Sequence, residues 1–141
     1  MFELRTVVGR ATEDPRTLAK LARIGLELCI ASNRVFLRAF RQKHGRRFPS
    51  IYKLARSGRV RYEREREAGE EFADALTVLG RGWGDCDDLI CWRIAELREA
   101  GEHATVIVYW RPRKPGEGWR FHCQLRRANG RIEDPSRFLG L

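Results

Sequence analysis

The stretch RGWGDCDDLICWRIAEL, residues 81–97, places a cysteine among carboxylates directly after a Gly-Trp-Gly bend. Asp85 suits a helix N-cap, and Asp88, three residues later, suits the reciprocal position of a capping box. A helix is therefore predicted from Cys86 to about Ala100. Three interpretations of Cys86 are open at this point: a nucleophile at a helix N-terminus, a metal ligand, or a small buried residue beside the cap.

The chain before this stretch is predicted to be largely helical. Residues 2–8, FELRTVV, suit a short strand, and Pro15 among neighbouring acids suits the start of a long helix. From Leu18 to Phe40 the apolar and small residues recur at three- and four-residue steps, as on a helix that faces a core. Residues 44–67 contain glycine and proline breakers and predict a loop with short elements, whereas residues 70–79 predict a second helix.

After the predicted 86–100 helix, the periodicity becomes that of strands. Residues 104–110, ATVIVYW, suit a buried strand, and the alternating segment 119–126 places His122 on the face opposite Cys123. A turn at RANG then returns the chain into a short strand at 131–133. Helices followed by antiparallel strands predict the α+β class.

Length and composition limit the kind of protein. A chain of 141 residues with 43% hydrophobic and 33% charged residues suits a single soluble domain, 1–141, with a basic helical part (1–67) and a core (68–141). The apolar runs are too short to span a bilayer and the first residues lack a secretory signal, so we expect no membrane association and a cytoplasmic location. The four cysteines lack the spacing of zinc sites, so no metal and no cofactor are expected.

The positive charge is concentrated in the first half of the chain. Residues 1–70 hold 17 Lys and Arg against 8 Asp and Glu, whereas residues 71–141 hold 11 of each. Such a concentration is often just a solvated face, but it also suits weak binding of nucleic acid or another polyanion. The candidate binding residues for this second interpretation are Arg34, Arg38, Arg41, Arg46, Arg47 and Lys53. No recognised nucleic-acid-binding motif accompanies them.

Three residues in the second half have the chemistry of a catalytic triad. Cys86 opens a helix, His122 lies on a later strand, and Asp134 follows the next strand. A helix N-terminus and an adjacent imidazolium both lower a thiol pKa, and a carboxylate can orient the imidazole. The neighbouring carboxylates of Asp85, Asp87 and Asp88 would disfavour a thiolate. Their side chains are therefore expected to turn toward the cap or the solvent.

The motifs around these residues resemble those of the transglutaminase-like superfamily of papain-fold cysteine proteins. The matching segments are GDCDDL (84–89), FHCQLRRANGRI (121–132) and EDPS (133–136). The resemblance covers about residues 80–137 and implies a papain-like α+β fold. It also implies that Cys86 is the nucleophile, His122 the base and Asp134 the residue that orients the base. Together with IYKLARSGRVRYERE upstream, these segments resemble small transglutaminase-like proteins encoded by tailed bacteriophages of actinobacteria.

The sequence also departs from that family. Many members have an aromatic residue shortly after the catalytic histidine, whereas this chain has HCQ, and no glutamine lies just before Cys86 to stabilise an oxyanion. The Cys86 N–H can supply one oxyanion donor. Trp83, Tyr52 and Tyr62 are candidates to line the substrate cleft or to supply a second donor.

The sequence therefore predicts thiol acyl chemistry on an amide of a protein or peptide substrate. Transfer to water would make the protein a cysteine peptidase or amidase, and transfer to an amine would make it a transglutaminase-type enzyme. The alternative is a non-catalytic phage structural or nucleic-acid-associated protein that keeps the fold. If the protein is encoded by a phage, it would reside in the host cytoplasm or in the virion. The sequence leaves the oligomeric state open.

Overall fold

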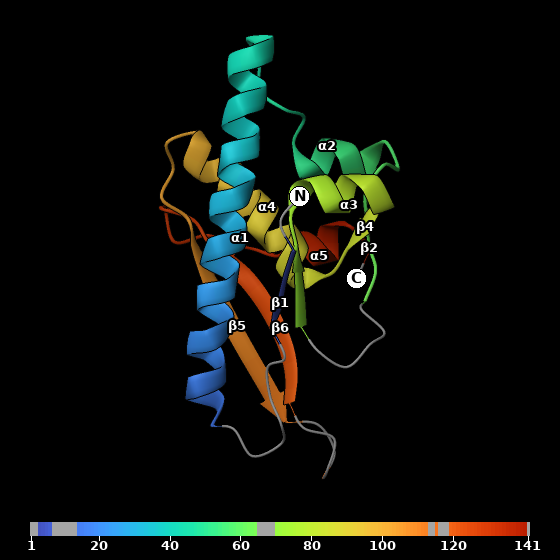
Figure 1. Ribbon diagram of the computed structural model, residues 1–141. Helices are drawn as coiled ribbons and strands as arrows, with labels where there is room; N and C mark the ends of the chain where they lie inside the picture. Colours follow the sequence, from blue (N-terminus) through green and yellow to red (C-terminus); the bar gives the residue numbers. More distant parts are fainter. Residues whose placement is uncertain (1–2, 7–13, 65–69, 113–114, 116–118, 141) are drawn as a thin grey trace.

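The chain folds as an α+β protein in which a long N-terminal helix and a second, central helix pack on a small antiparallel sheet (Figure 1). The computed structural model describes residues 3–6, 14–64, 70–112, 115 and 119–140. The predicted α+β class is confirmed. In chain order the elements are β1 (Glu3–Thr6), α1 (Pro15–His44), α2 (Ile51–Arg56), β2 (Arg61–Tyr62), β3 (Glu70–Ala73), α3 (Ala75–Arg81), β4 (Trp83–Gly84), α4 (Cys86–Glu99), β5 (Thr105–Pro112), β6 (Trp119–Arg126), β7 (Ile132–Glu133) and α5 (Pro135–Phe138).

Helix α1 is the longest element and carries the predicted apolar face. Pro15 occupies its first turn, and Leu26 and Ile30 are fully buried against α4 and the sheet. The helix ends where Gly45 adopts a left-handed conformation, φ 66°, and its N–H donates to the carbonyl of Arg41 over 2.9 Å. No helix within the described ranges is both long and apolar enough to cross a bilayer.

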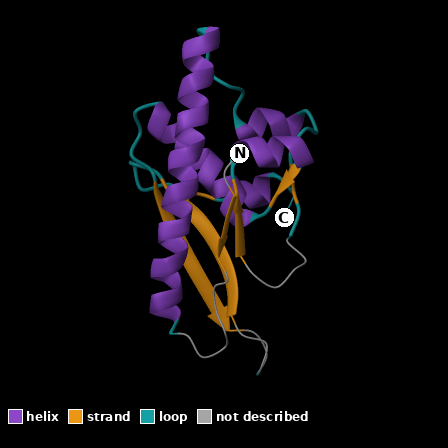
Figure 2. Cartoon of the chain, in the orientation of Figure 1, coloured by secondary structure: helices purple, strands orange, loops and turns teal. Residues whose placement is uncertain are grey.

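The sheet has the order β5-β6-β7, and both pairs are antiparallel. Its two long strands, β5 and β6, lie side by side in Figure 2. Within β6 the alternation is as predicted, because Cys123 and Leu125 are fully buried in the core while His122 is only half-buried. The register pairs Leu125 with Glu133 of β7. The short turn between β6 and β7 therefore returns Asp134, the next residue, to the side of β6.

Residues 70–79 do not form the single helix that their composition predicts. Residues 70–73 form β3, which pairs antiparallel with β1, and α3 begins only at Ala75. The Asp74 carboxylate caps that helix by accepting the N–H of Thr77 over 2.9 Å. Pairing with a strand about 65 residues earlier thus outweighs the local helical preference, a contribution that no local pattern reveals.

Helix α4 lies at the centre of the molecule and is buried on nearly all sides. Ile90 and Ile94 pack with α1 and β6, whereas Leu89 and Trp92 pack with α2 and α3. A helix buried on all sides has little amphipathic character. Its predicted start is confirmed, since the side chain and backbone of Asp85 form a capping box with Asp88.

Candidate active site

The three candidate triad residues meet at the N-terminus of α4. Cys86 is the first residue of α4, His122 lies on β6, and Asp134 lies between β7 and α5. The central helix, the middle strand and the end of the sheet each contribute one residue. The fold therefore brings together residues that are 48 positions apart in the sequence.

His122 pairs with the carboxylate of Asp134, and Gln124 binds the same carboxylate oxygen. His122 Nε2 lies 2.9 Å from Asp134 Oδ2, and Gln124 Nε2 donates to the same oxygen over 3.2 Å. Burial raises the pKa of Asp134, but these hydrogen bonds hold the pKa below its usual range. Because Nε2 is engaged, Nδ1 is the ring nitrogen left for Cys86. Gln124 was not predicted as a site residue, although strand alternation places it on the same face as His122.

The pKa of the Cys86 thiol is lowered although its side chain is only 8% exposed. Interaction with the Cys123 thiol lowers its pKa, burial opposes this, and His122 lowers the pKa further, to about 7. In turn, Cys86 raises the pKa of His122, burial lowers it, and Asp134 raises it again. Both directions favour a thiolate–imidazolium pair. The contact between Cys86 and His122 is loose, because no aligned hydrogen bond joins Cys86 Sγ to the His122 ring. Such loose geometry is common in enzymes without bound substrate.

Cys123 is a part of the site that the sequence showed only as a departure from the family. Its side chain is fully buried, and burial followed by the interaction with Cys86 raises its pKa well above the usual value. Cys123 therefore stays a thiol and can donate its S–H to a Cys86 thiolate. The signal in the sequence was its position directly after His122.

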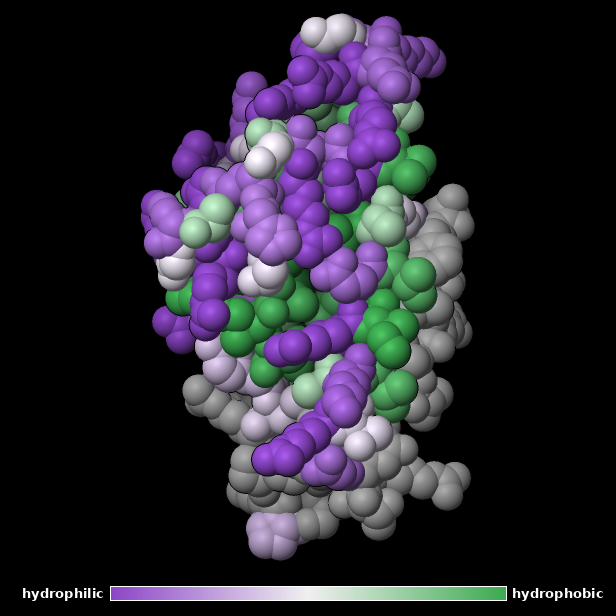
Figure 3. All heavy atoms as spheres, turned by 90° about the vertical axis from the view of Figure 1, so that its left-hand side faces the viewer, coloured by the Kyte–Doolittle hydropathy of each residue, from purple (hydrophilic) through white to green (hydrophobic). Residues whose placement is uncertain are grey.

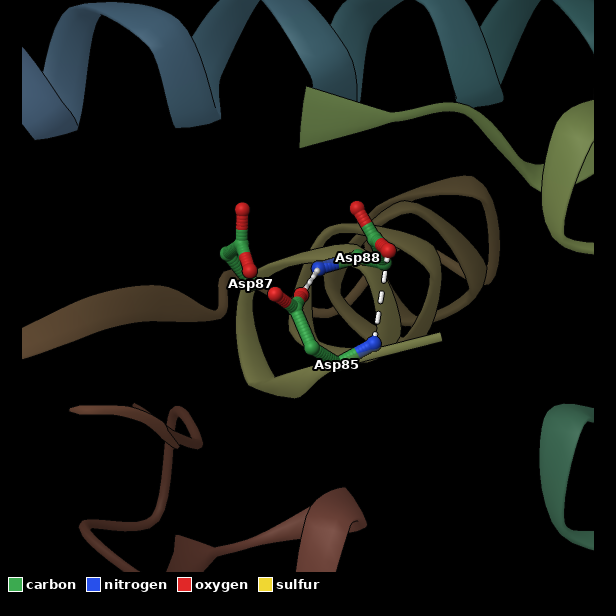
Figure 4. A group of neighbouring side chains, drawn as sticks. All are labelled: Asp85, Asp87 and Asp88. Carbon is green, nitrogen blue, oxygen red and sulfur yellow. Dashed lines mark hydrogen bonds between the residues drawn. The ribbon is translucent and has the colours of Figure 1, made fainter. Parts of the chain in front are cut away.

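Two of the three neighbouring carboxylates serve the helix cap, as predicted (Figure 4). Asp85 Oδ1 accepts the N–H of Asp88, and Asp88 Oδ2 accepts the N–H of Asp85. Asp88 also binds the Arg81 guanidinium and accepts the N–H of Ala73 over 2.6 Å. Burial and Asp85 raise the pKa of Asp88, while Arg81 and the Ala73 N–H oppose the rise.

For Asp87 the expectation was wrong, because its side chain is fully buried rather than turned to the cap or the solvent. No donor reaches either of its oxygens. Burial, and then the neighbouring carboxylate of Asp85, raise the pKa of Asp87 well above its usual value. A proton on Asp87 can be donated to Asp85, whose carboxylate lies beside it in Figure 4. Protonation removes one of the three negative charges that would disfavour a Cys86 thiolate.

The carboxylates of Asp85, Asp87 and Asp88 are also the group, within the described part of the chain, whose spacing suits a metal ion. Their oxygens lie within 4.8 Å of one another. However, Asp85 and Asp88 already accept backbone N–H groups and Asp88 binds a guanidinium. The positive end of the helix macrodipole further disfavours a cation. Two of the three carboxylates, those of Asp85 and Asp88, are thus already engaged at the helix cap.

Two of the predicted cleft residues lie close to the nucleophile in the fold. Trp83 is half-buried three residues before Cys86, and the Arg81 guanidinium lies 3.6 Å from the centre of its ring. Tyr62 of β2 pairs with Gly84 of β4, and Gly84 lies two residues before Cys86. The pairing therefore places Tyr62 beside the start of α4.

Tyr52, the third predicted cleft residue, is engaged elsewhere. Its hydroxyl donates to Glu133 Oε2 over 2.8 Å. Glu133 also binds Arg93 Nε at 3.0 Å and Arg127 Nη1 at 2.9 Å. Because Glu133 directly precedes Asp134, these bonds fix the backbone that carries the triad carboxylate. Tyr52 is thus a support for the triad and not a free donor to substrate.

The predicted basic patch divides into paired and unpaired residues. Glu99 of α4 binds both Arg34 Nε, at 2.8 Å, and Arg38 Nη2, at 2.9 Å. The remaining candidates are exposed and have no carboxylate partner among the described residues: Arg41, Arg46, Arg47 and Lys53. Sequence reasoning did not anticipate Glu99, because it lies 65 and 61 residues after the two arginines that it binds.

A comparison of this chain with models of protein families, with curated proteins and with solved structures finds no match. The interpretation of the site therefore depends on its geometry and on the motifs around the triad.

Proposed function

We propose that this protein is a thiol-dependent acyl-transfer enzyme that acts on amide bonds of a protein or peptide through Cys86, His122 and Asp134. The main support is the pairing of His122 Nε2 with Asp134 at 2.9 Å, which leaves Nδ1 for a cysteine at a helix N-terminus. That arrangement provides an activated nucleophile, a base and a group that orients the base. The transglutaminase-like family and the phage association remain part of the proposal, supported by the motifs alone.

The proposed reaction begins with attack of the Cys86 thiolate on the amide carbonyl carbon. The new C–S bond forms as the carbonyl π electrons move to oxygen, giving a tetrahedral oxyanion. When the oxyanion collapses, the C–N bond breaks and the His122 Nδ1 proton passes to the leaving amine. Water or a second amine then attacks the thioester, gives a proton to Nδ1, and the Cys86 thiolate leaves.

The start of α4 also supplies oxyanion stabilisation. The first N–H groups of a helix have no intrahelical acceptor, and the N–H of Cys86 is one of them. It can donate to the oxyanion that forms beside its own thiolate. The choice between water and an amine as acceptor separates a peptidase or amidase from a transglutaminase-type enzyme, and the proposal includes both.

The proposal is tested with 4-nitrophenyl acetate, a small activated acyl donor. We expect a burst of nitrophenolate and an acetyl group on Cys86, located by peptide mass spectrometry. Addition of hydroxylamine should release the acetyl group as a hydroxamate. Cys86→Ala should abolish the burst and His122→Ala should reduce it by about 100-fold or more.

Cys29→Ala is the matched control, because it removes a buried cysteine outside the triad. Acetylation that spreads evenly over lysines and the other cysteines, or a burst that survives Cys86→Ala, would contradict the proposal. The site would then be a helix cap in a non-catalytic protein that keeps the fold, which is the alternative function.

A further inference from the structure

A cavity of about 270 Å³ opens between the C-terminal half of α1, the segment before α2 and the second half of α4. The ribbons of these segments lie in the upper part of Figure 1. Its lining combines apolar residues with arginines and glutamates. The residues used below are Leu37, Phe48 and Leu97, the arginines Arg41 and Arg47, and the two acids Glu96 and Glu99.

The cavity is separate from the triad. On α4 and its C-cap residue the lining runs from Arg93 to Ala100, which is 7 to 14 residues after Cys86. At a rise of 1.5 Å per residue, these positions lie roughly 10–20 Å along the helix from the nucleophile. The cavity is therefore not the position of the scissile bond, and a ligand in it is independent of the proposed acyl chemistry.

The acids on the cavity wall are already neutralised by neighbours. Glu96 accepts the N–H of Ile51 over 2.7 Å and binds Arg93 at 3.1 Å. Burial also raises the pKa of Glu96 to about 7, against the effects of those two donors. Glu99 is bound by both Arg34 and Arg38. Neither acid offers a free charge to a cationic ligand.

The arginines at the cavity differ from these acids. Arg41 and Arg47 are both exposed, and neither has a carboxylate partner within the described ranges. A guanidinium without a partner at a partly enclosed site is a ready donor for a carboxylate or phosphate. The uncompensated charge at the cavity is therefore positive.

The remaining wall is apolar. Leu37 and Leu97 are nearly fully buried, and the Phe48 ring packs edge-on against Phe36 and Phe40 at centroid distances of 5.1 Å and 4.9 Å. A phosphate or carboxylate alone would leave this surface uncovered. A ligand with both an anionic group and a compact apolar body matches both parts of the wall.

From this complementarity we propose that the cavity is a binding site for a small amphiphilic anion, a carboxylate or a phosphate monoester on an aromatic or aliphatic body. Arg41 and Arg47 bind the anionic group, and Leu37, Phe48 and Leu97 cover the body. The volume is close to the lower limit of ligand cavities, about 300 Å³, so the ligand is of single-ring size.

The test uses phenyl phosphate and phenylacetate as probes in calorimetric titrations of the full chain at fixed salt. Both probes should bind, and inorganic phosphate, which lacks the apolar body, should bind at least about tenfold more weakly. Each of Arg41→Gln and Arg47→Gln should weaken phenyl phosphate by about tenfold, because each removes a charge-assisted hydrogen bond. Arg59→Gln is the matched control, since Arg59 is exposed and outside the cavity.

Failure of both probes to bind would overturn the proposal, and so would equal binding by inorganic phosphate. Tighter binding of benzylamine than of phenyl phosphate would show that the glutamates dominate the cavity. Loss of binding that is no larger in Arg41→Gln and Arg47→Gln than in Arg59→Gln would show only a general charge effect. Because the probes do not involve the triad, these outcomes are independent of the acyl-transfer experiment.

Discussion

At the scale of single residues, the chemistry of Cys86 depends on a balance between opposing neighbours. Cys123 and His122 stabilise its thiolate, whereas burial and the charge of Asp85 destabilise it. The sequence alone showed the acids and predicted that they would weaken the nucleophile. The structure adds the thiol of Cys123, and the net effect on Cys86 is a lowered pKa. Burial also raises the pKa of Asp87, which favours its uncharged form beside the thiol.

Alkylation at low pH measures this balance directly. With a pKa of about 7, Cys86 holds roughly thirtyfold more thiolate at pH 6 than an ordinary thiol of pKa about 8.5. We therefore expect brief iodoacetamide treatment at pH 6 to label Cys86 at least about tenfold faster than the other three cysteines, even though a thiol of lower pKa is a weaker nucleophile. Peptide mapping gives the four rates.

The same measurement separates the roles of the triad residues. His122→Ala should slow the labelling of Cys86 and move its pH dependence upward, because the ring lowers the thiol pKa. Asp134→Ala should have a smaller effect, since the imidazole is retained and only its orientation and raised pKa are lost. Labelling of Cys86 that is no faster than that of Cys29 would mean that burial and the acids dominate.

Asp87 provides a second prediction, on stability. Its folded pKa is raised above the ordinary value of 3.8, so the folded state retains a proton that the unfolded state loses as pH rises. The unfolding free energy should therefore fall between pH 4 and the folded pKa, by up to about 1.4 kcal/mol per pH unit. Asp87→Asn removes this titration, so its stability relative to wild type should rise from pH 4 to pH 7.

Urea denaturation at the two pH values tests this difference. Asp14→Asn, which removes an exposed carboxylate, is the matched control for the loss of one acidic side chain. An Asp87→Asn variant that loses as much stability as wild type between pH 4 and pH 7 would show that Asp87 is ionised in the fold.

At the scale of elements, the sequence predicted the helix ends and strand faces that depend on neighbouring residues. The capping residues Asp85 and Asp88 predicted the start of α4, and Gly45 marks the end of α1. The alternation around His122 predicted the two faces of β6. Residues 70–73 could not be predicted in this way, because they form a strand only through pairing with β1. The β2–β4 contact has two residues in each strand and is too short to show a period.

The same substitution, glycine to alanine, is expected to have opposite effects on stability at two helical glycines, because only one of them packs closely against a strand. A Cβ placed on Gly25 of α1 would lie 2.6 Å from Cε2 of the fully buried Phe72 ring, whereas one on Gly80 of α3 would meet nothing within 4 Å. Gly25→Ala should therefore destabilise the protein by about 1–3 kcal/mol through overpacking. Gly80→Ala should stabilise it by up to about 1 kcal/mol, because alanine favours the helix.

Chemical denaturation of the two variants measures both effects with the same substitution. Stabilisation by Gly25→Ala would mean that Phe72 can move aside and that the contact between α1 and β3 is not tight.

At the scale of the whole molecule, the motifs pointed to three residues that lie together in the fold, but they did not reveal the surroundings of these residues. Cys86, His122 and Asp134 occur in motifs whose order and spacing are informative. The contributions of Gln124 and Cys123 depend instead on which side chains meet after folding. The same holds for the basic patch, where Glu99 from α4 neutralises part of the charge, a pairing that no local pattern contains.

The net charge of +9 supports weak binding of polyanions as a property of the folded molecule. Figure 3 shows hydrophilic residues over most of the upper part of one face, around the C-terminal half of α1. Arg46 and Arg47, just after α1, are exposed without carboxylate partners in the described part of the chain, whereas Arg34 and Arg38 share Glu99. The unpaired residues should therefore make the phosphate contacts.

Two double variants that remove equal charge test this distribution. Each contact with a phosphate of duplex DNA adds about −0.9 to the slope of log K against log salt concentration, because the contact releases condensed counterions. Arg46→Gln with Arg47→Gln should reduce the steepness of that slope by about 2, and Arg34→Gln with Arg38→Gln should change it by less. Fluorescence anisotropy with a random-sequence duplex at several salt concentrations gives both slopes. Equal effects of the two pairs would mean that only net charge matters, and affinity that does not depend on salt would mean that the basic residues only solvate the surface.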